Sequence, residues 1–141
     1  MLIPGLLQEI ALAINKVEQD IESPHLSQIG VAEMRDFVLA ITHGEKDHDA
    51  YHCARIHSQN LRELALAINK GEKNRSERHV DKIHAPDLRE VALLIGNRER
   101  STTDFHASRI ESRDLRHFAL AISNREQSYS DNYIGRLGER P

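Results

Sequence analysis

The feature of this sequence that most constrains its fold is an octapeptide that returns five times at one fixed interval. The copy "LRELALAI" begins at residue 61, and the copies "LQEIALAI", "MRDFVLAI", "LREVALLI" and "LRHFALAI" begin at residues 7, 34, 88 and 115. Five units of 27 residues, 7–33, 34–60, 61–87, 88–114 and 115–141, therefore follow one another without a gap. A fixed period of this length is typical of architectures in which similar units stack. We predict a single repeat domain over residues 1–141, in which residues 1–6 form an N-terminal cap segment.

Each unit opens with the pattern of an amphipathic helix. In the third unit the apolar residues are spaced i, i+3, i+4 and i+7, at Leu61, Leu64, Ala65 and Ile68. Polar residues that are good N-caps precede this stripe at Asn60, Asp87 and Asp114, and glycines suited to a C-cap follow it at Gly44 and Gly71. We predict one helix of about 10 to 12 residues at the start of each unit.

A second helix is predicted in the latter part of each unit. Its N-caps would be the polar column Asp20, Asp47, Asn74, Ser101 and Ser128. Two apolar columns follow three residues apart, Leu26, Cys53, Val80, Ala107 and Ile134, then Ile29, Ile56, Ile83, Ile110 and Leu137. This spacing favours a helix of about nine residues, so that each unit is a helical hairpin.

A single hairpin cannot bury its apolar face, whereas stacked hairpins form a continuous core. We therefore predict an all-α fold, a short right-handed α-solenoid of five helical-hairpin repeats with open ends. The alternative is a leucine-rich-repeat-like α/β solenoid, because "LRELALAIN" fits the opening L-x-x-L-x-L-x-x-N. That alternative requires alanines in a strand, although alanine is a good helix former and a poor strand former.

Composition excludes several broad classes. The chain is 39% hydrophobic with a net charge of −3, so no overall positive field attracts nucleic acid or anionic lipid. No apolar run approaches the roughly 20 residues of a membrane helix, and the first residues do not have the pattern of a signal peptide. The one cysteine, Cys53, suits a reducing compartment. We expect a cytoplasmic protein without a membrane partner.

Two columns of ionisable residues run through the units. One is Glu18, Glu45, Glu72, Glu99 and Glu126, and the other is His25, His52, His79 and His106, which Tyr133 completes. We interpret both as structural ladders, because equivalent atoms in stacked helices lie about 9–10 Å apart, too far to share a metal ion. If the histidines are buried and neutral, stability should decrease below about pH 6. A pH-sensing role therefore stays open.

One local metal candidate is the i, i+4 pair His48 and His52. It is weak because the sequence pattern supplies no dependable third ligand, and we expect no cofactor. Cys53 shares its column with Leu26, Val80 and other apolar residues, so we interpret it as a small hydrophobe. No nucleophile, base and acid stand apart from the repeat columns. We therefore expect no catalytic residues and no enzyme activity.

Function in repeat proteins usually depends on positions that vary between units. Tyr51, Arg78 and Phe105 occupy one such column, and the column Arg62, Arg89 and Arg116 offers basic groups. We predict an interaction scaffold that binds another protein through these six residues. One alternative is an anion or nucleic-acid binder that uses the Arg62, Arg89 and Arg116 column with a second basic column, Arg55, Lys82 and Arg109. Another is a structural repeat protein that self-associates through open solenoid ends.

Overall fold

The computed structural model describes residues 4–137, and within this range the fold is all-helical, as predicted. Each unit contributes one long helix: α1 (Pro4–Asn15), α2 (Ala32–Thr42), α3 (Gln59–Asn69), α5 (Pro86–Gly96) and α6 (Arg113–Ser123). These helices are 11 or 12 residues long, which confirms the first predicted helix of each unit. The described range contains no strand, so the leucine-rich-repeat alternative is wrong.

The second helix of each unit is much shorter than predicted. It is a 3-10 segment in three units (Leu26–Gln28, Cys53–Arg55, Ala107–Arg109) and an α-helix in two, α4 (Arg78–Asp81) and α7 (Asn132–Arg136). The predicted helical hairpin is therefore wrong in its second arm. The physical reason is that the preceding residues form turns, in which side chains such as Asp104 accept backbone hydrogen bonds from residues 100 and 101 at 2.8 and 3.1 Å. Those turns occupy the residues that a longer helix would need.

The long helices also begin earlier than the N-cap pattern suggested. The N-caps are Ser58 and Ser112 in α3 and α6, and their hydroxyls accept hydrogen bonds from the N–H groups of Leu61 and Leu115 at 3.3 and 3.2 Å. The predicted caps have another task. Asn60 accepts a hydrogen bond from the His84 N–H at 2.8 Å, so it holds the end of the next unit rather than its own helix.

Two residues after the end of each long helix stands a residue with left-handed backbone geometry. The predicted Gly44 and Gly71 have φ of +66° and +62°, which confirms them as C-terminal caps. The equivalent residues in the other units are Val17, Arg98 and Arg125, with φ between +54° and +58°. The repeat imposes this geometry even where a side chain makes it costly.

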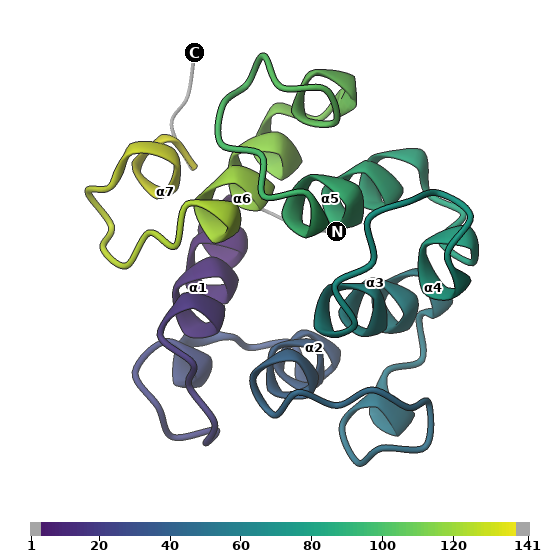
Figure 1. Ribbon diagram of the computed structural model, residues 1–141. Coiled ribbons are helices and arrows are strands. Elements are labelled where there is room, and N and C mark those ends of the chain that lie inside the picture. Colours follow the sequence, from purple (N-terminus) through teal and green to yellow (C-terminus); the bar gives the residue numbers. More distant parts are fainter. Residues whose placement is uncertain (1–3, 138–141) are drawn as a thin grey trace.

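The long helices are arranged around a closed circle (Figure 1). In chain order α1 packs on α2, α2 on α3, α3 on α5 and α5 on α6, and α6 packs on α1. The structure therefore does not confirm the predicted open solenoid, because the first and last long helices cover each other. The predicted cap segment 1–6 is no separate element either, since residues 4–6 belong to α1; residues 1–3 lie outside the described range.

The hydrogen bonds of the closing interface repeat those of an internal interface. Within the chain, Nδ2 of Asn69 donates to the carbonyls of Ala40 and Glu45 at 2.9 and 2.7 Å. At the closure, Nδ2 of Asn15 donates to the equivalent carbonyls, those of residues 121 and 126, at 3.1 and 2.7 Å. The fifth unit therefore meets the first as the second meets the third.

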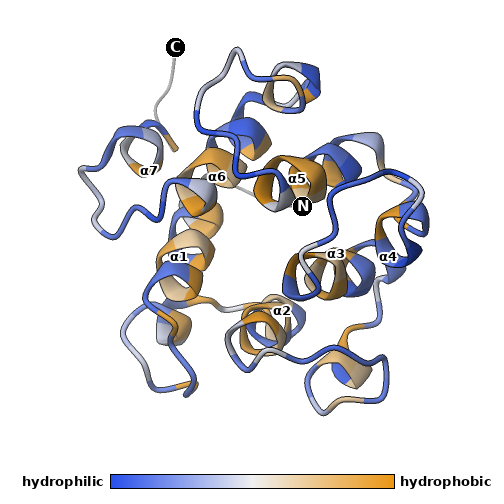
Figure 2. Cartoon of the chain, in the orientation of Figure 1, coloured by the Kyte–Doolittle hydropathy of each residue, from blue (hydrophilic) through white to orange (hydrophobic). Residues whose placement is uncertain are grey.

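The apolar core follows this circle (Figure 2). The two apolar columns of the short segments are buried, as predicted, and they cover the outer sides of the long helices. On the inner side, nine large apolar residues from all five long helices converge on a void of about 10 Å³: Leu7, Ile10, Met34, Phe37, Leu61, Leu64, Leu88, Leu115 and Phe118. Within residues 4–137 no helix is both long and apolar enough to cross a bilayer.

Candidate functional site

The glutamate column caps the short helical segments. In every unit its carboxylate accepts hydrogen bonds from two successive backbone N–H groups at the start of that segment. In the third unit Glu72 accepts from the N–H groups of His79 and Val80, both at 2.9 Å. Carboxylates are favoured at this position because the N–H groups at a helix start lack partners in the helix. The column Glu18, Glu45, Glu72, Glu99 and Glu126 makes this contact in all five units.

The histidine column faces a second set of carboxylates, at the third position of each of the first four units: Glu9, Asp36, Glu63 and Glu90. His79 Nδ1 lies 2.7 Å from Glu63 Oε1, and the shortest equivalent contacts of His25, His52 and His106 measure 3.0, 3.4 and 2.8 Å. Each pair lies within one unit, so the imidazoles tie the short segment to the long helix. The decrease of stability below about pH 6, which was expected if these histidines are buried and neutral, stays a prediction.

The fifth unit reverses the pair. His117 stands where the other units have an acid, and its ring lies 5.6 Å from that of Tyr133, which replaces the ladder histidine. Burial, together with the charges of Arg113, Arg116 and Arg136, lowers the pKa of His117 to about 4. Its side chain is therefore neutral at physiological pH. The sequence carried a signal for this exchange. The histidine column ends in Tyr133, and the column of acids that faces it ends in His117.

The predicted metal pair is not brought together as expected. His52 Nδ1 faces Asp36 Oδ1 at 3.4 Å, whereas His48 Nε2 lies 2.7 Å from Glu63 Oε2 in the next unit. The other oxygen of Glu63 binds His79, so one carboxylate joins two imidazoles. Burial acts to raise the pKa of Glu63, but hydrogen bonds from His79 and His48 hold it below the usual value. Sequence spacing missed this cluster because its members come from two units.

The exposed aromatic residues carry matching arginines. The side chains of Tyr51 and Phe105 are 68% and 64% exposed, as their column suggested. The guanidinium of Arg55 lies 5.4 Å from the Tyr51 ring centre, and that of Arg109 lies 5.2 Å from the Phe105 ring centre. Such cation–π contacts restrict both side chains. We call Tyr51 with Arg55 and Phe105 with Arg109 the aromatic–arginine pairs.

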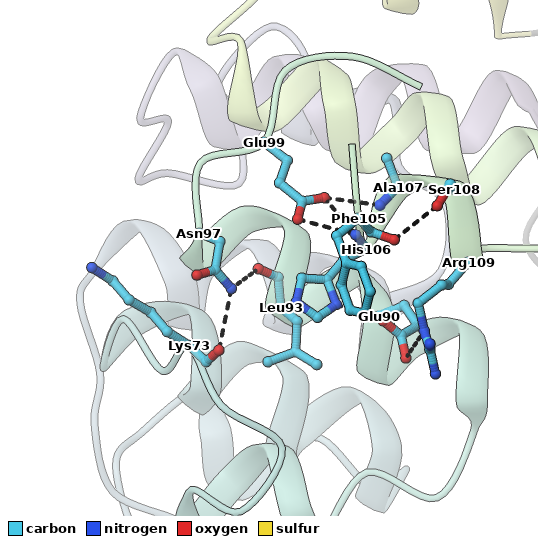
Figure 3. Close-up of polar contacts among 10 residues, drawn as sticks. All are labelled: Lys73, Glu90, Leu93, Asn97, Glu99, Phe105, His106, Ala107, Ser108 and Arg109. Atoms are coloured by element: carbon cyan, nitrogen blue, oxygen red, sulfur yellow. Dashed lines mark hydrogen bonds and ion pairs between the residues drawn. The ribbon is translucent and has the colours of Figure 1, made fainter. Parts of the chain in front are cut away.

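Each aromatic–arginine pair rests on the ladder beneath it. The Phe105 ring meets the His106 ring edge-on, with centres 4.8 Å apart, and Arg109 Nε lies 3.4 Å from Glu90 Oε2 (Figure 3). In the second unit the Tyr51 and His52 ring centres are also 4.8 Å apart, and Arg55 likewise faces an acid, Asp36. The third unit, between them, places the exposed Arg78 in the same column. The two pairs therefore flank a third basic group on the outer side of the circle.

The predicted column Arg62, Arg89 and Arg116 forms hydrogen bonds within the molecule. Nη1 of Arg62, Arg89 and Arg116 donates to the carbonyls of residues 56, 83 and 110 at 2.7, 2.9 and 2.6 Å. At the closure Gln8 takes the same place, and its Nε2 donates to the Leu137 carbonyl at 2.8 Å. These arginines connect neighbouring units, and their predicted role in partner binding stays a prediction.

A hollow of about 540 Å³ lies at the end of the circle where the long helices finish. Its floor is apolar, with Ile14, Ile68, Ile95 and Ile122, and its rim carries the basic residues Lys73, Arg98 and Arg125. Volumes of this order are typical of small-molecule sites. Sequence reasoning gave these rim residues no site role, because only the closed circle brings them around one opening.

Cys53 fits its predicted structural place. Its side chain is fully buried, and burial followed by the nearby Glu45 raises its pKa to about 11. A thiol in this state is a poor nucleophile at neutral pH, because the thiolate is the reactive form.

No protein-family model matches this chain, and no match was found among curated proteins or solved structures.

Proposed function

We propose that the chain is a protein-binding scaffold whose contact surface is the outer stripe of Tyr51, Arg78 and Phe105. The observation that carries the proposal is the exposure of the two aromatic rings, 68% and 64%, while each is held against an arginine. Aromatic and arginine side chains are enriched among the residues that dominate binding energy in protein interfaces. Rings already restricted lose less conformational freedom on binding.

The chemistry of the stripe indicates the kind of partner. Tyr51 and Phe105 offer apolar surface, and Arg55, Arg78 and Arg109 surround it with positive charge. A complementary protein surface would present apolar side chains flanked by carboxylates. The stripe belongs to three consecutive units, so a partner would contact the repeat array rather than one turn.

The test is affinity capture from source lysate with the double variant Tyr51→Ala, Phe105→Ala beside the unchanged chain. We expect a discrete protein to be retained by the unchanged chain and lost by the double variant. Ile21→Ser is the matched control, because Ile21 is 60% exposed but lies outside the stripe. A partner that the double variant retains with undiminished affinity would contradict the stripe as the contact surface.

A second candidate function, anion binding, is supported by the hollow. Arg98 and Arg125 have left-handed backbones, with φ of +58°, at a position where two other units have glycine. A side chain at this geometry costs about 1 kcal/mol relative to glycine. Together with Lys73, the two guanidinium groups place positive charge around one opening, which supports an anion as the ligand.

Titration with tripolyphosphate at low salt tests the second candidate. We expect Arg98→Gly together with Arg125→Gly to weaken binding at least about tenfold. Val17→Gly has the same backbone geometry without a charge and should leave the affinity unchanged. Equal affinity in all three proteins would remove the hollow as an anion site. If single-stranded RNA binds with a steep salt dependence that the double variant retains, the predicted arginine column would be favoured instead.

A further inference from the structure

We propose that His48, Glu63 and His79 form a binding site for a divalent metal ion of the zinc class, shared by the second and third units. The site differs from the i, i+4 pair that the sequence suggested. It replaces His52 with a histidine from the next unit and adds a carboxylate.

The donor atoms are already gathered. Glu63 Oε2 lies 2.7 Å from His48 Nε2, Glu63 Oε1 lies 2.7 Å from His79 Nδ1, and all the ligand atoms are within 4.8 Å of one another. Zinc binds nitrogen and carboxylate oxygen at about 2.0–2.2 Å, which places donors of a tetrahedral site about 3.4 Å apart. The change from the present spacing is a small rotation of side chains.

The surroundings favour a cation that enters from solvent. Glu63 and His79 form a rigid floor, since each side chain is 3% exposed and lies on α3 or α4. His48 lies on a turn and its side chain is 39% exposed, so it can move to admit the ion. The two carboxylate oxygens of Glu63 each face one of the two imidazoles. Two imidazoles, one carboxylate and one open position for water match the ligand set of many zinc sites.

A zinc ion would bind His79 through one ring nitrogen and leave the ring proton on the other. Nδ1, which now faces Glu63, must bind the ion through its lone pair, so the ring proton lies on Nε2. That nitrogen is buried and has no hydrogen-bond partner within the described range. A buried N–H group without an acceptor has a free-energy cost, which the zinc–nitrogen bond would have to exceed.

The closing interface is a natural counterpart that lacks one ligand. Tyr129 takes the place of His48, and its hydroxyl donates to Glu9 Oε2 at 2.6 Å while His25 Nδ1 lies 3.0 Å from Glu9 Oε1. The hydrogen bond to Glu9 raises the pKa of Tyr129 to about 12, so the phenol keeps its proton at neutral pH. The remaining units have Ile21, Arg75 and Thr102 at this position. Among the five residues of this column, only His48 of the second unit is a histidine.

The experiment is titration of the full chain with Zn²⁺ by calorimetry and with Co²⁺ by visible absorption. We expect one ion per chain. His48→Tyr copies the closing interface into the second unit and should weaken binding by more than about 100-fold. His52→Gln is the matched control, because His52 faces Asp36 instead, and its affinity should equal that of the unchanged chain. Circular dichroism establishes that both variants are folded.

Unchanged affinity in His48→Tyr, or loss of binding in His52→Gln, would overturn the proposal. If His48→Tyr does not fold, the reciprocal variant Tyr129→His decides the question. It completes a second set of ligands with Glu9 and His25, so the number of bound Co²⁺ ions should rise from one to two. A stoichiometry that stays at one, or is zero in both proteins, would refute the assignment.

Discussion

The interface between the second and third units and the interface between the fifth and first units are alike in structure and differ in how the chain reaches them. The asparagine contacts of the internal interface join residues 24 and 29 apart in sequence, whereas those of the closing interface join residues 106 and 111 apart. A fourfold longer loop costs only about 1 kcal/mol more in closure entropy. The same residue columns that hold neighbouring units together are therefore sufficient to join the first unit to the fifth.

The two interfaces also differ chemically at single positions. The internal interface has Arg62 and His48 where the closing interface has Gln8 and Tyr129, yet each side chain reaches the equivalent acceptor. The backbone geometry of the repeat therefore decides which groups meet, and the side chain decides the chemistry of the contact. Variants at equivalent positions of different units test how far this equivalence extends.

The largest effect is expected at Gly96, where α5 lies close to the backbone of the preceding unit. A methyl group added by Gly96→Ala would overlap the carbonyl oxygen of Glu72, which belongs to the backbone and cannot move freely. We expect a loss of about 3 kcal/mol in the free energy of unfolding, measured by urea denaturation. Ser123→Ala at the equivalent position of the fifth unit removes one hydrogen bond to the Glu99 carbonyl and should cost only about 1 kcal/mol. Equal losses of stability in the two variants would mean that α5 approaches Glu72 no more closely than α6 approaches Glu99.

The fifth unit should make stability depend on pH. The pKa of His117 is about 4 in the folded chain and 6.5 in the unfolded chain, so the unfolded state binds the proton first as pH falls. The contribution of neutral His117 to the free energy of unfolding is complete above pH 6.5. This contribution decreases by about 2–3 kcal/mol as the pH falls toward 4.

Melting temperatures between pH 7.5 and 4.5 measure this effect. His117→Gln should reduce the slope, whereas His84→Gln, which changes an exposed imidazole, should preserve it. A slope that His117→Gln leaves intact would assign the pH dependence to other groups.

The equivalence of the two interfaces can be broken directly with paired asparagine variants. Asn69→Ala and Asn15→Ala each remove two hydrogen bonds from equivalent places, and each should cost about 1–2 kcal/mol. Chemical denaturation of both variants measures the comparison. If Asn15→Ala costs nothing while Asn69→Ala is destabilising, the closing interface is open in solution.

The smallest effect is a gain in stability. Val17 has φ of +54° at the position where the second and third units have glycine, and a β-branched residue is strained there. Val17→Gly should raise the free energy of unfolding by about 1 kcal/mol, less the entropy that glycine adds to the unfolded chain. Gly44→Val is the reverse change and should lower it. The same sign for both variants would contradict the role of backbone geometry.

The repeat length, the long helices and the buried columns were predictable from the sequence because they depend on local periodicity. Apolar spacing selects a helix wherever it occurs, and a left-handed cap after the stripe can be inferred from Gly44 and Gly71. The length of the second helix was not predictable in this way, because side chains such as Glu72 and Asp104 bind backbone groups that a longer helix would have used internally.

The closed circle and the sites that depend on it were decided by tertiary structure. The rotation between neighbouring units accumulates over the array, and no single unit encodes whether the fifth meets the first. That meeting covers α1 and α6, gathers Arg98 and Arg125 around one hollow, and turns Asn15 and Gln8 into inter-unit contacts. The pairing of His48 with Glu63 and His79 likewise depends on how two units pack. The sequence by itself determined the repeat and the long helix of each unit, because apolar spacing and helix preference act between neighbours in the chain. Packing geometry between units determined what the five units form together.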